Sequence, residues 1–117
     1  MSSGTTPEQQ SYFVKLDECS KHTIFPGVDI ATMPGQQMMI SIVTFEPHSK
    51  VAPHQHPHEQ VGVLVEGELT FNIGGQVQTL GPGEMWRIPG GIEHSVVSGA
   101  KPAKAIDIFH PIRDDYR

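Results

Sequence analysis

Residues 54–67 read HQHPHEQVGVLVEG, a run of alternating histidines followed by an apolar stretch of β type. An extended chain rises about 3.3 Å per residue, so a straight strand would hold His54 and Gln60 roughly 20 Å apart. One metal ion needs its donor atoms at about 2.0–2.3 Å, so both residues can serve one ion only if the chain turns between them. We therefore expect His54 and His56 on one face at the end of a strand, a turn at residues 57–59, and Gln60 at the start of the returning strand.

Short β segments separated by turn residues extend this pattern over the rest of the chain, whereas no long window keeps a helical periodicity. We expect strands within residues 36–46, 60–73, 76–80, 81–89, 93–99 and 103–111. Gly74 and Gly75 separate two such segments and predict a two-residue hairpin. The spacing of roughly 8–12 residues per strand predicts an all-β sandwich or barrel.

The composition limits the class of protein. The chain has 117 residues, which fits one domain. Its formal net charge is −5, from 8 basic and 13 acidic residues, and it has no basic run, so we expect no nucleic-acid partner. Cys19 is the sole cysteine, which excludes an intramolecular disulfide and a cysteine-based zinc knuckle.

The start of the chain and its short apolar runs favour a cytoplasmic protein with no membrane partner. Residues 1–10 are polar and lack the apolar core of a signal peptide. The apolar runs elsewhere are far too short to cross a bilayer. We expect a flexible tail at residues 1–10 and one domain at residues 11–117.

Two stretches resemble the motifs of the cupin family. Residues 54–67 match the first motif, with Gln60 where a glutamate is usual and Gly67 at the end. Residues 83–94, GEMWRIPGGIEH, match the second motif through Gly83, Pro89, Gly91 and His94. The resemblance implies a single-domain cupin jelly-roll, a β-barrel or sandwich that encloses one divalent transition metal ion, whether Zn, Ni, Fe, Mn or Cu. The ligands that it implies are His54, His56, Gln60 and His94.

The remaining polar residues near the first motif have plainer interpretations. His58 and Glu59 are expected to be exposed turn residues, although Glu59 could also orient a histidine ligand. His22, His48 and His110 lie outside both motifs, and we expect none of them to be a ligand. Without the second motif, the paired histidines themselves would be read as solvated loop residues.

The glutamine affects the chemistry of the implied site. Three imidazoles and one amide oxygen are all neutral ligands, so the ion would keep its full +2 charge. Such an ion is a stronger Lewis acid than one that is also bound by a glutamate. The ligand set therefore favours polarisation of a substrate over oxygen chemistry.

The C-terminal stretch AIDIFHPIRDDYR (105–117) carries a second group of candidate residues. Asp107 and Phe109 alternate in phase with Ala105, so the three share one face of a strand. If that face is inward, Asp107 is a carboxylate in an apolar cavity, which is costly unless the group is paired or functional. The alternatives are an ion pair between Asp107 and Arg113, or an Arg113 that lies in solvent with its acidic neighbours.

Three features together resemble a group of small cupins, that of the pectin-degradation protein KdgF. They are the HPHEQ stretch with its glutamine, the second cupin motif and the ending of the type ID-x-F-x-P-x-R-[ED]-D-[FY]. One departure is the pair Trp86 and Arg87 before the PxG element. The resemblance implies a metal-dependent enzyme that linearises 4,5-unsaturated monouronates, released by pectin or alginate lyases, to 4-deoxy-5-keto uronates.

The same resemblance assigns roles to three residues. Asp107 would be the general base or a proton shuttle, Arg113 would bind a substrate oxygen or carboxylate, and Phe109 would shape the pocket. The partners it implies are a small anionic sugar as substrate and a second copy of the chain in a homodimer. Two other functions stay open, a metal-dependent dioxygenase and a non-catalytic cupin that binds a sugar or another small ligand.

Overall fold

The computed structural model describes residues 11–117, and the expected flexible tail at residues 1–10 lies outside the described residues. The described part contains ten strands and two short 3₁₀ turns. In chain order they are η1 (Leu16–Glu18), β1 (Ser20–Phe25), β2 (Val28–Pro34), β3 (Met39–Phe45), β4 (Lys50–His54), β5 (Glu59–Glu66), β6 (Leu69–Ile73), β7 (Gln76–Leu80), β8 (Met85–Ile88), β9 (His94–Ser98), β10 (Ala103–His110) and η2 (Asp114–Tyr116).

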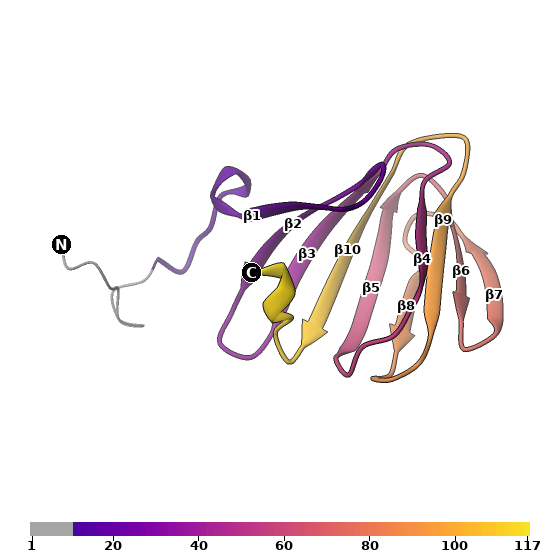
Figure 1. Cartoon of the computed structure of the whole chain (residues 1–117). Helices are drawn as coiled ribbons and strands as arrows, with labels where there is room; N and C mark the ends of the chain where they lie inside the picture. The colour runs from indigo at the N-terminus through magenta and orange to yellow at the C-terminus, as the bar shows by residue number, and fades with distance from the viewer. Residues whose placement is uncertain (1–10) are drawn as a thin grey trace.

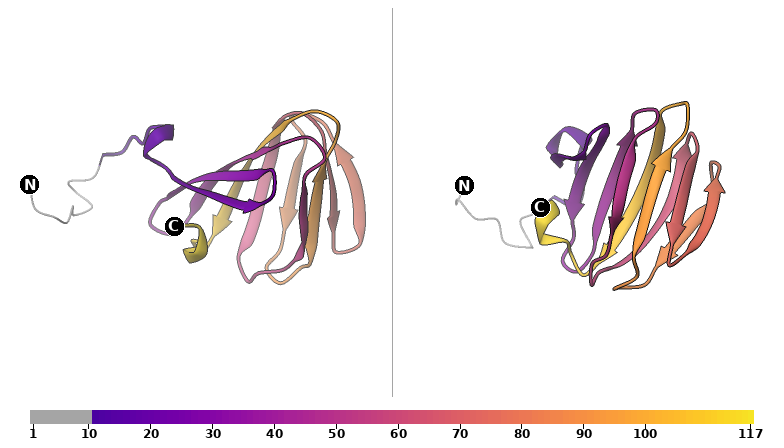
Figure 2. Two further views of the ribbon diagram at one scale, coloured as in Figure 1. Left: turned by 45° about the horizontal axis from the view of Figure 1, so that its top comes forward. Right: turned by 45° about the vertical axis from the view of Figure 1, so that its right-hand side comes forward.

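The strands form two antiparallel sheets that pack face to face (Figure 1). One sheet has six strands in the order β1-β2-β3-β10-β5-β8, and the other has four in the order β4-β9-β6-β7. The right-hand view of Figure 2 shows the strands of both sheets running along a roughly common direction, with the C-terminal turn η2 beside the six-stranded sheet. The predicted all-β, two-layer fold is confirmed.

Alternation along the strands explains why the sheets close on each other. In β10 the side chains at 103, 105, 107 and 109 are buried, and those between them are half-buried or exposed. Leu64, Leu69 and Ile88 from the other strands are almost completely enclosed in the core. Truncating such a buried aliphatic side chain typically costs about 2–5 kcal/mol, so these contacts hold the two sheets together.

The turn predictions are confirmed where glycine supplies the geometry. Gly74 and Gly75 connect β6 to β7 and have φ values of 56° and 89°, which suit a two-residue hairpin turn. Gly67 lies between β5 and β6 with a φ of 86°. A Cβ at Gly67 would approach the Ala103 Cα and Cβ at 2.8 Å, so this corner of the first motif has no room for a side chain.

Two strands, β1 and β2, were not predicted. β1 and β2 pair across a turn at Pro26 and Gly27, and β2 alternates buried and less buried residues, a hairpin signal that the sequence does carry. β4 is the strand expected before the turn at residues 57–59, and it is present although it is short and contains Pro53. The expectation that His54 and His56 share the face of one strand is wrong in detail. β4 ends at His54, so His56 lies in the loop that follows, and β5 begins at Glu59 instead of Gln60.

Candidate metal centre

The histidines of both motifs converge at one end of the barrel. His54 ends β4, and His94 begins β9 directly opposite it in the antiparallel register. The ring centroids of His54 and His94 are 4.3 Å apart, and the ring of His56 lies 5.0 Å from that of His94. One ring nitrogen from each of the three lies within 4.8 Å of the others, so the three residues could hold one metal ion.

Backbone carbonyls select the ring nitrogen that each histidine presents. The Nδ1 atoms of His54, His56 and His94 lie 2.9–3.0 Å from the carbonyl oxygens of Ala52, His58 and Ile92. Since a carbonyl only accepts, each Nδ1 donates its hydrogen and each Nε2 keeps its lone pair. The Nε2 of His94 is buried and has no hydrogen-bond partner among the described residues. These are the features of imidazoles oriented to bind a metal through Nε2.

Gln60 completes the donor set from β5. Its amide oxygen lies 3.1 Å from the Nε2 of His56, and both side chains are buried. Its amide N–H group also interacts with the carboxylate of Asp107 and opposes the rise in the pKa of that group. Two lone pairs, those of the Gln60 oxygen and the His56 Nε2, therefore face each other. A cation near both atoms would make this arrangement favourable, so the residues present fit a divalent ion.

Two of these histidines, His56 and His94, are held neutral by their surroundings. Burial, together with the nearby positive charge of Arg113, lowers the pKa of His56 to about 4. Burial also lowers the pKa of His94. Neutral imidazoles are the form that binds metals, so protons compete weakly with an ion near neutral pH.

Asp107 belongs to a row of directly opposite residues that runs across neighbouring strands of the six-stranded sheet. It lies opposite Ser41 of β3 on one side and opposite Gly62 of β5 on the other, and Gly62 in turn lies opposite Trp86 of β8. The indole nitrogen of Trp86 donates a hydrogen bond of 2.8 Å to the Oδ1 of Asp107. Trp86 was not predicted as a site residue, although it is in phase with the apolar Ile88 and its inward direction is readable from the sequence.

Burial dominates the acidity of Asp107. It raises the pKa of the carboxyl from its ordinary 3.8 to about 6, against the opposing hydrogen bonds from Gln60 and Trp86 and the charge of Arg113. A carboxyl with a pKa near 6 is ionised at neutral pH and still releases its proton easily once it has accepted one. The position therefore suits a group that first takes and then returns a proton.

Arg113 reaches the cavity from the segment that follows β10. It is buried, and its guanidinium lies 4.0 Å from the centre of the Tyr116 ring and 5.4 Å from that of Phe109. Its NH2 group forms an ion pair of 2.8 Å with Asp115. Both alternatives for Arg113 are therefore wrong, since it neither pairs with Asp107 nor lies in solvent.

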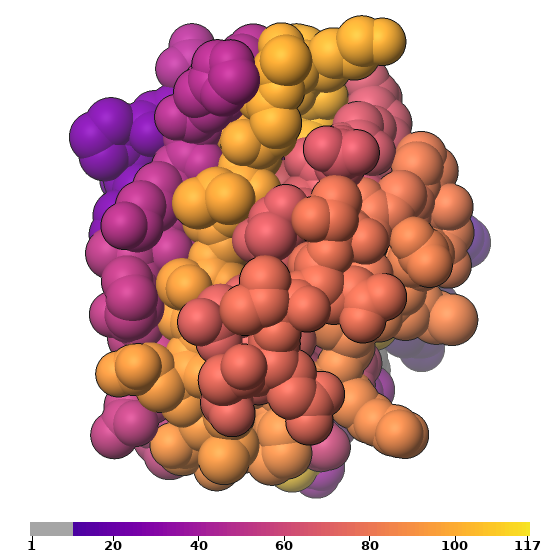
Figure 3. Space-filling model, turned by 90° about the vertical axis from the view of Figure 1, so that its right-hand side faces the viewer, coloured from indigo at the N-terminus to yellow at the C-terminus, as the bar shows by residue number. Residues whose placement is uncertain are grey.

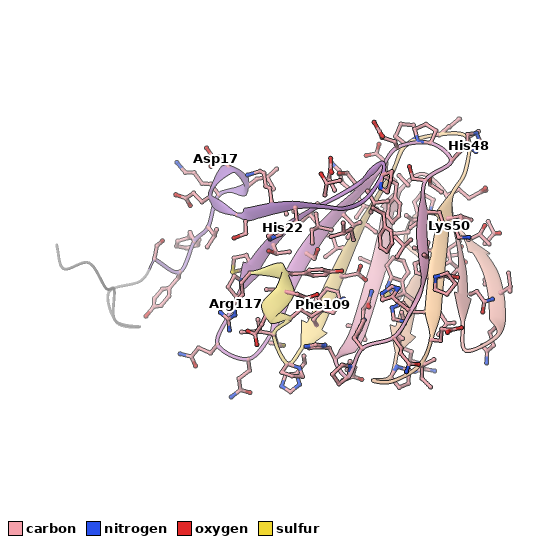
Figure 4. The ribbon with its side chains drawn as sticks, in the orientation of Figure 1. Asp17, His22, His48, Lys50, Phe109 and Arg117 are labelled. Carbon is pink, nitrogen blue, oxygen red and sulfur yellow. The ribbon has the colours of Figure 1, made fainter. Side chains whose placement is uncertain are left out.

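Hydrogen bonds and an aromatic contact hold the turn η2 over this end of the barrel. The carbonyl oxygen of Tyr116 lies 2.6 Å from the Thr32 hydroxyl and 3.1 Å from the His22 Nε2. The ring of Tyr116 packs at 5.8 Å against that of Phe109. Figure 4 shows His22 and Phe109 close to this turn. His22 thus has a structural contact with η2.

The candidate residues surround one interior cavity. Six of the seven predicted site residues line its wall. The exception is His56, whose ring packs against that of His94. The cavity volume is about 50 Å³. The Ser41 hydroxyl belongs to the wall and has no hydrogen-bond partner among the described residues. From the side of the β6–β7 hairpin, the described residues present a filled surface with no deep hollow (Figure 3).

The other histidines lie apart from the cluster or support it. His48 is exposed in the loop between β3 and β4, at the opposite end of the barrel (Figure 4), and His110 is exposed at the end of β10. Glu59 is exposed, as expected. His58 is half-buried instead of exposed, because its ring packs 5.5 Å from that of His56.

Comparison with known proteins identifies the fold family. The profile of the family described as Cupin domain matches residues 41–109. KdgF from Halomonas sp. has a similar structure, with a TM-score of 0.80 and 29% sequence identity over 91% of this chain and 97% of that one. An RmlC-like cupin from Shewanella frigidimarina has a TM-score of 0.83 and 25% identity over 92% and 97% of the two chains. This chain is thus a small all-β cupin that resembles KdgF.

More distant likeness extends to larger enzymes. A variant of oxalate decarboxylase from Bacillus subtilis has a TM-score of 0.79 at 14% identity, over 88% of this chain and 30% of that one, which shows a shared fold alone. A search of curated proteins found no match. Among the described residues, no helix has the length and apolar character that crossing a membrane requires.

Proposed function

We propose that this chain, which belongs to the cupin family, is a metal-dependent enzyme that linearises 4,5-unsaturated monouronates to 4-deoxy-5-keto uronates. One observation carries the proposal. A buried carboxylate with a pKa of about 6, Asp107, shares one small cavity with His94, whose pKa is lowered by burial, and with the cationic Arg113. The likeness to KdgF from Halomonas sp., at 29% identity over 91% of this chain, supports the uronate as substrate.

The reaction needs a base and an acid at two positions of the sugar. Asp107 accepts the proton of the anomeric hydroxyl, and the bond between C1 and the ring oxygen breaks. The electrons of that bond stay on the ring oxygen, which becomes an enolate at C5 conjugated with the substrate carboxylate. Asp107 then returns its proton to C4, which gives the 5-keto product and restores the base. No atom is gained or lost, so one carboxyl group of suitable pKa is sufficient for both proton transfers.

Other residues of the chain stabilise the charge that develops. His54, His56, Gln60 and His94 would hold the divalent ion, which supplies a Lewis acid for the oxygens of the substrate. Arg113 pairs with the substrate carboxylate, since its planar guanidinium matches the two oxygens of that group. The Gln60 amide contacts both His56 and Asp107, so it links the ligand set to the base.

Entry of a uronate requires the cavity to widen. A volume of about 50 Å³ is far below the several hundred Å³ of typical small-molecule sites. The segment that limits the space is the C-terminal turn, whose Tyr116 and Arg113 belong to the cavity wall. The two hydrogen bonds to the Tyr116 carbonyl are the contacts that must loosen for η2 to swing outward.

An absorbance assay tests the activity. The conjugated acid of the unsaturated uronate absorbs in the ultraviolet, and linearisation removes this absorbance. Metal-loaded protein should accelerate the loss, and chelated protein should not. Oxygen consumption by the loaded protein would indicate a dioxygenase, and saturable uronate binding without turnover would indicate a binding protein. Either result, with no faster loss of absorbance, would contradict the proposed reaction.

We also propose a homodimer that covers the outer face of β5, β8 and β10. This face carries exposed apolar side chains, among them Val61, Ile108 and Met85, of which Met85 is 73% exposed. Tyr12 and Phe13 at the start of the described chain are 89% and 86% exposed. Sedimentation equilibrium should give a dimer for the native protein and a monomer for Met85→Lys. A native monomer at micromolar concentration would refute this assembly.

A further inference from the structure

Gly62 leaves an opening between two side chains that would otherwise be separated by a strand. Trp86 and Asp107 lie on strands β8 and β10, on either side of β5, and both are in register with Gly62. Neighbouring strands are about 4.8 Å apart, so the two residues are roughly 10 Å apart along the sheet. A Cβ at position 62 would lie 2.5 Å from the Asp107 Oδ1 and would overlap the indole ring of Trp86. Only glycine at this position lets the indole reach the carboxylate.

The indole is held firmly in this opening. Trp86 is 7% exposed, and its ring packs against that of Phe71 in the opposite sheet, with centroids 4.4 Å apart and planes inclined by 34°. The 2.8 Å hydrogen bond to Asp107 therefore comes from a donor that both sheets keep in place. A carboxylate anchored at one oxygen cannot turn freely about its Cβ–Cγ bond.

The choice of donor matters for a residue that transfers protons. An indole N–H donates a hydrogen bond but neither accepts one nor ionises in the physiological range. It can orient Asp107 without competing for the proton that Asp107 takes from a substrate. A tyrosine or a lysine in the same place could exchange that proton.

We propose that Trp86, acting through the gap at Gly62, is a positioning residue that fixes the orientation of the Asp107 carboxylate toward Gln60 and the bound substrate. The catalytic consequence rests on the proposed function, in which Asp107 is the base. The hydrogen bond and the restricted carboxylate do not rest on it, so they can be tested separately.

The first experiment reads the hydrogen bond directly. Trp86 is the only tryptophan of the chain, so its indole N–H gives the only tryptophan side-chain signal in a ¹⁵N correlation spectrum. Asp107→Ala should move this signal upfield and speed its exchange with water at least tenfold, while the backbone signals of distant strands keep their positions. An indole signal with the same shift and exchange rate in both proteins would overturn the proposal.

The second experiment separates positioning from packing. Trp86→Phe keeps an aromatic ring against Phe71 and removes the N–H donor together with part of the ring volume, so a control for lost packing is needed. We expect kcat to fall about tenfold to a hundredfold, with KM within twofold and an unchanged metal content. Val28→Ala, in the core but outside the cavity wall, serves as a destabilised control and should keep the native kcat.

A double-mutant comparison makes the test specific. If Trp86 acts through Asp107, the step from Trp to Phe should change kcat less than twofold in the Asp107→Asn background. An equal loss in both backgrounds, or a native kcat for Trp86→Phe, would overturn the positioning role while leaving the proposed reaction intact. A native protein with no activity on the uronate would refute the proposed function, and the indole signal would then still decide whether Trp86 holds Asp107.

Discussion

Replacing Asp107 by asparagine should stabilise the metal-free protein near neutral pH while it lowers kcat steeply. The carboxyl is enclosed in the barrel, and burial raises its pKa from the ordinary 3.8 to about 6. Asparagine has nearly the same shape and carries no charge. Its amide oxygen can accept the Trp86 hydrogen bond, and the Gln60 amide can turn to present its oxygen to the new N–H group.

The size of the effect follows from the difference in proton affinity. A tenfold difference between the folded and unfolded states corresponds to about 1.4 kcal/mol, so the raised pKa amounts to about 3 kcal/mol. The folded-state pKa lies above the unfolded one, so the folded protein binds this proton more tightly. The contribution of Asp107 to stability is therefore complete below about pH 4 and is lost as the pH rises through about 6. At pH 7 the buried carboxylate is ionised, and its burial lowers the free energy of unfolding of the native protein by the full amount. The uncharged side chain of Asp107→Asn has no such cost.

Urea denaturation of both proteins at several pH values measures this difference. The free energy of unfolding of Asp107→Asn should exceed that of the native protein by about 2–2.5 kcal/mol more at pH 7 than at pH 4. The buried imidazoles titrate in both proteins, so their pH dependence largely cancels in the comparison. A difference that stays constant between pH 4 and pH 7 would refute the buried, weakly acidic carboxylate and with it the argument for Asp107 as base.

A matched control comes from a carboxylate in the opposite situation. Asp115 is exposed and pairs with Arg113, whose hydrogen bond and charge lower the pKa of the Asp115 carboxyl despite partial burial. Asp115→Asn should therefore destabilise the protein near neutral pH, by no more than about 1 kcal/mol because the pair is solvated. A gain in stability at pH 7 for Asp115→Asn would indicate that general charge repulsion, and not burial, explains the result at Asp107.

Three further outcomes are expected. His94→Ala should weaken metal binding by at least about 100-fold, because it removes an oriented ligand, and elemental analysis after dialysis would measure this loss. Gln60→Glu places a second carboxylate against Asp107, which raises the pKa of Asp107, so the acid limb of the pH–rate profile should move to higher pH, and an unmoved limb would contradict the contact. Ser41→Ala removes a buried hydroxyl that has no partner among the described residues, so the free energy of unfolding should rise by about 1 kcal/mol. A higher KM for the same variant would indicate that the substrate satisfies this hydroxyl.

Much of the fold could be predicted from patterns of residues that are close together in the sequence. The hairpin at Gly74 and Gly75 and the alternation that buries Asp107 and Phe109 were predicted and are confirmed. The β1–β2 hairpin was missed although its turn at Pro26 and Gly27 was visible. The convergence of His54, His56 and His94 was implied by the resemblance to the cupin motifs, and their nitrogens meet within 4.8 Å. That they bind a metal stays a prediction.

Sequence patterns by themselves determined which residues face inward, because alternation and turn chemistry depend only on residues a few positions apart. Only the tertiary structure decided which inward residues meet. Gly62, Trp86 and Asp107 are far apart in the chain and become neighbours because β5 lies between β8 and β10 in the sheet. The pairing of Arg113 with Asp115 and the Nδ1 contacts of the histidines were likewise decided by the folded backbone. Cross-strand register depends on the packing of all ten strands together, and no local stretch of sequence contains that information.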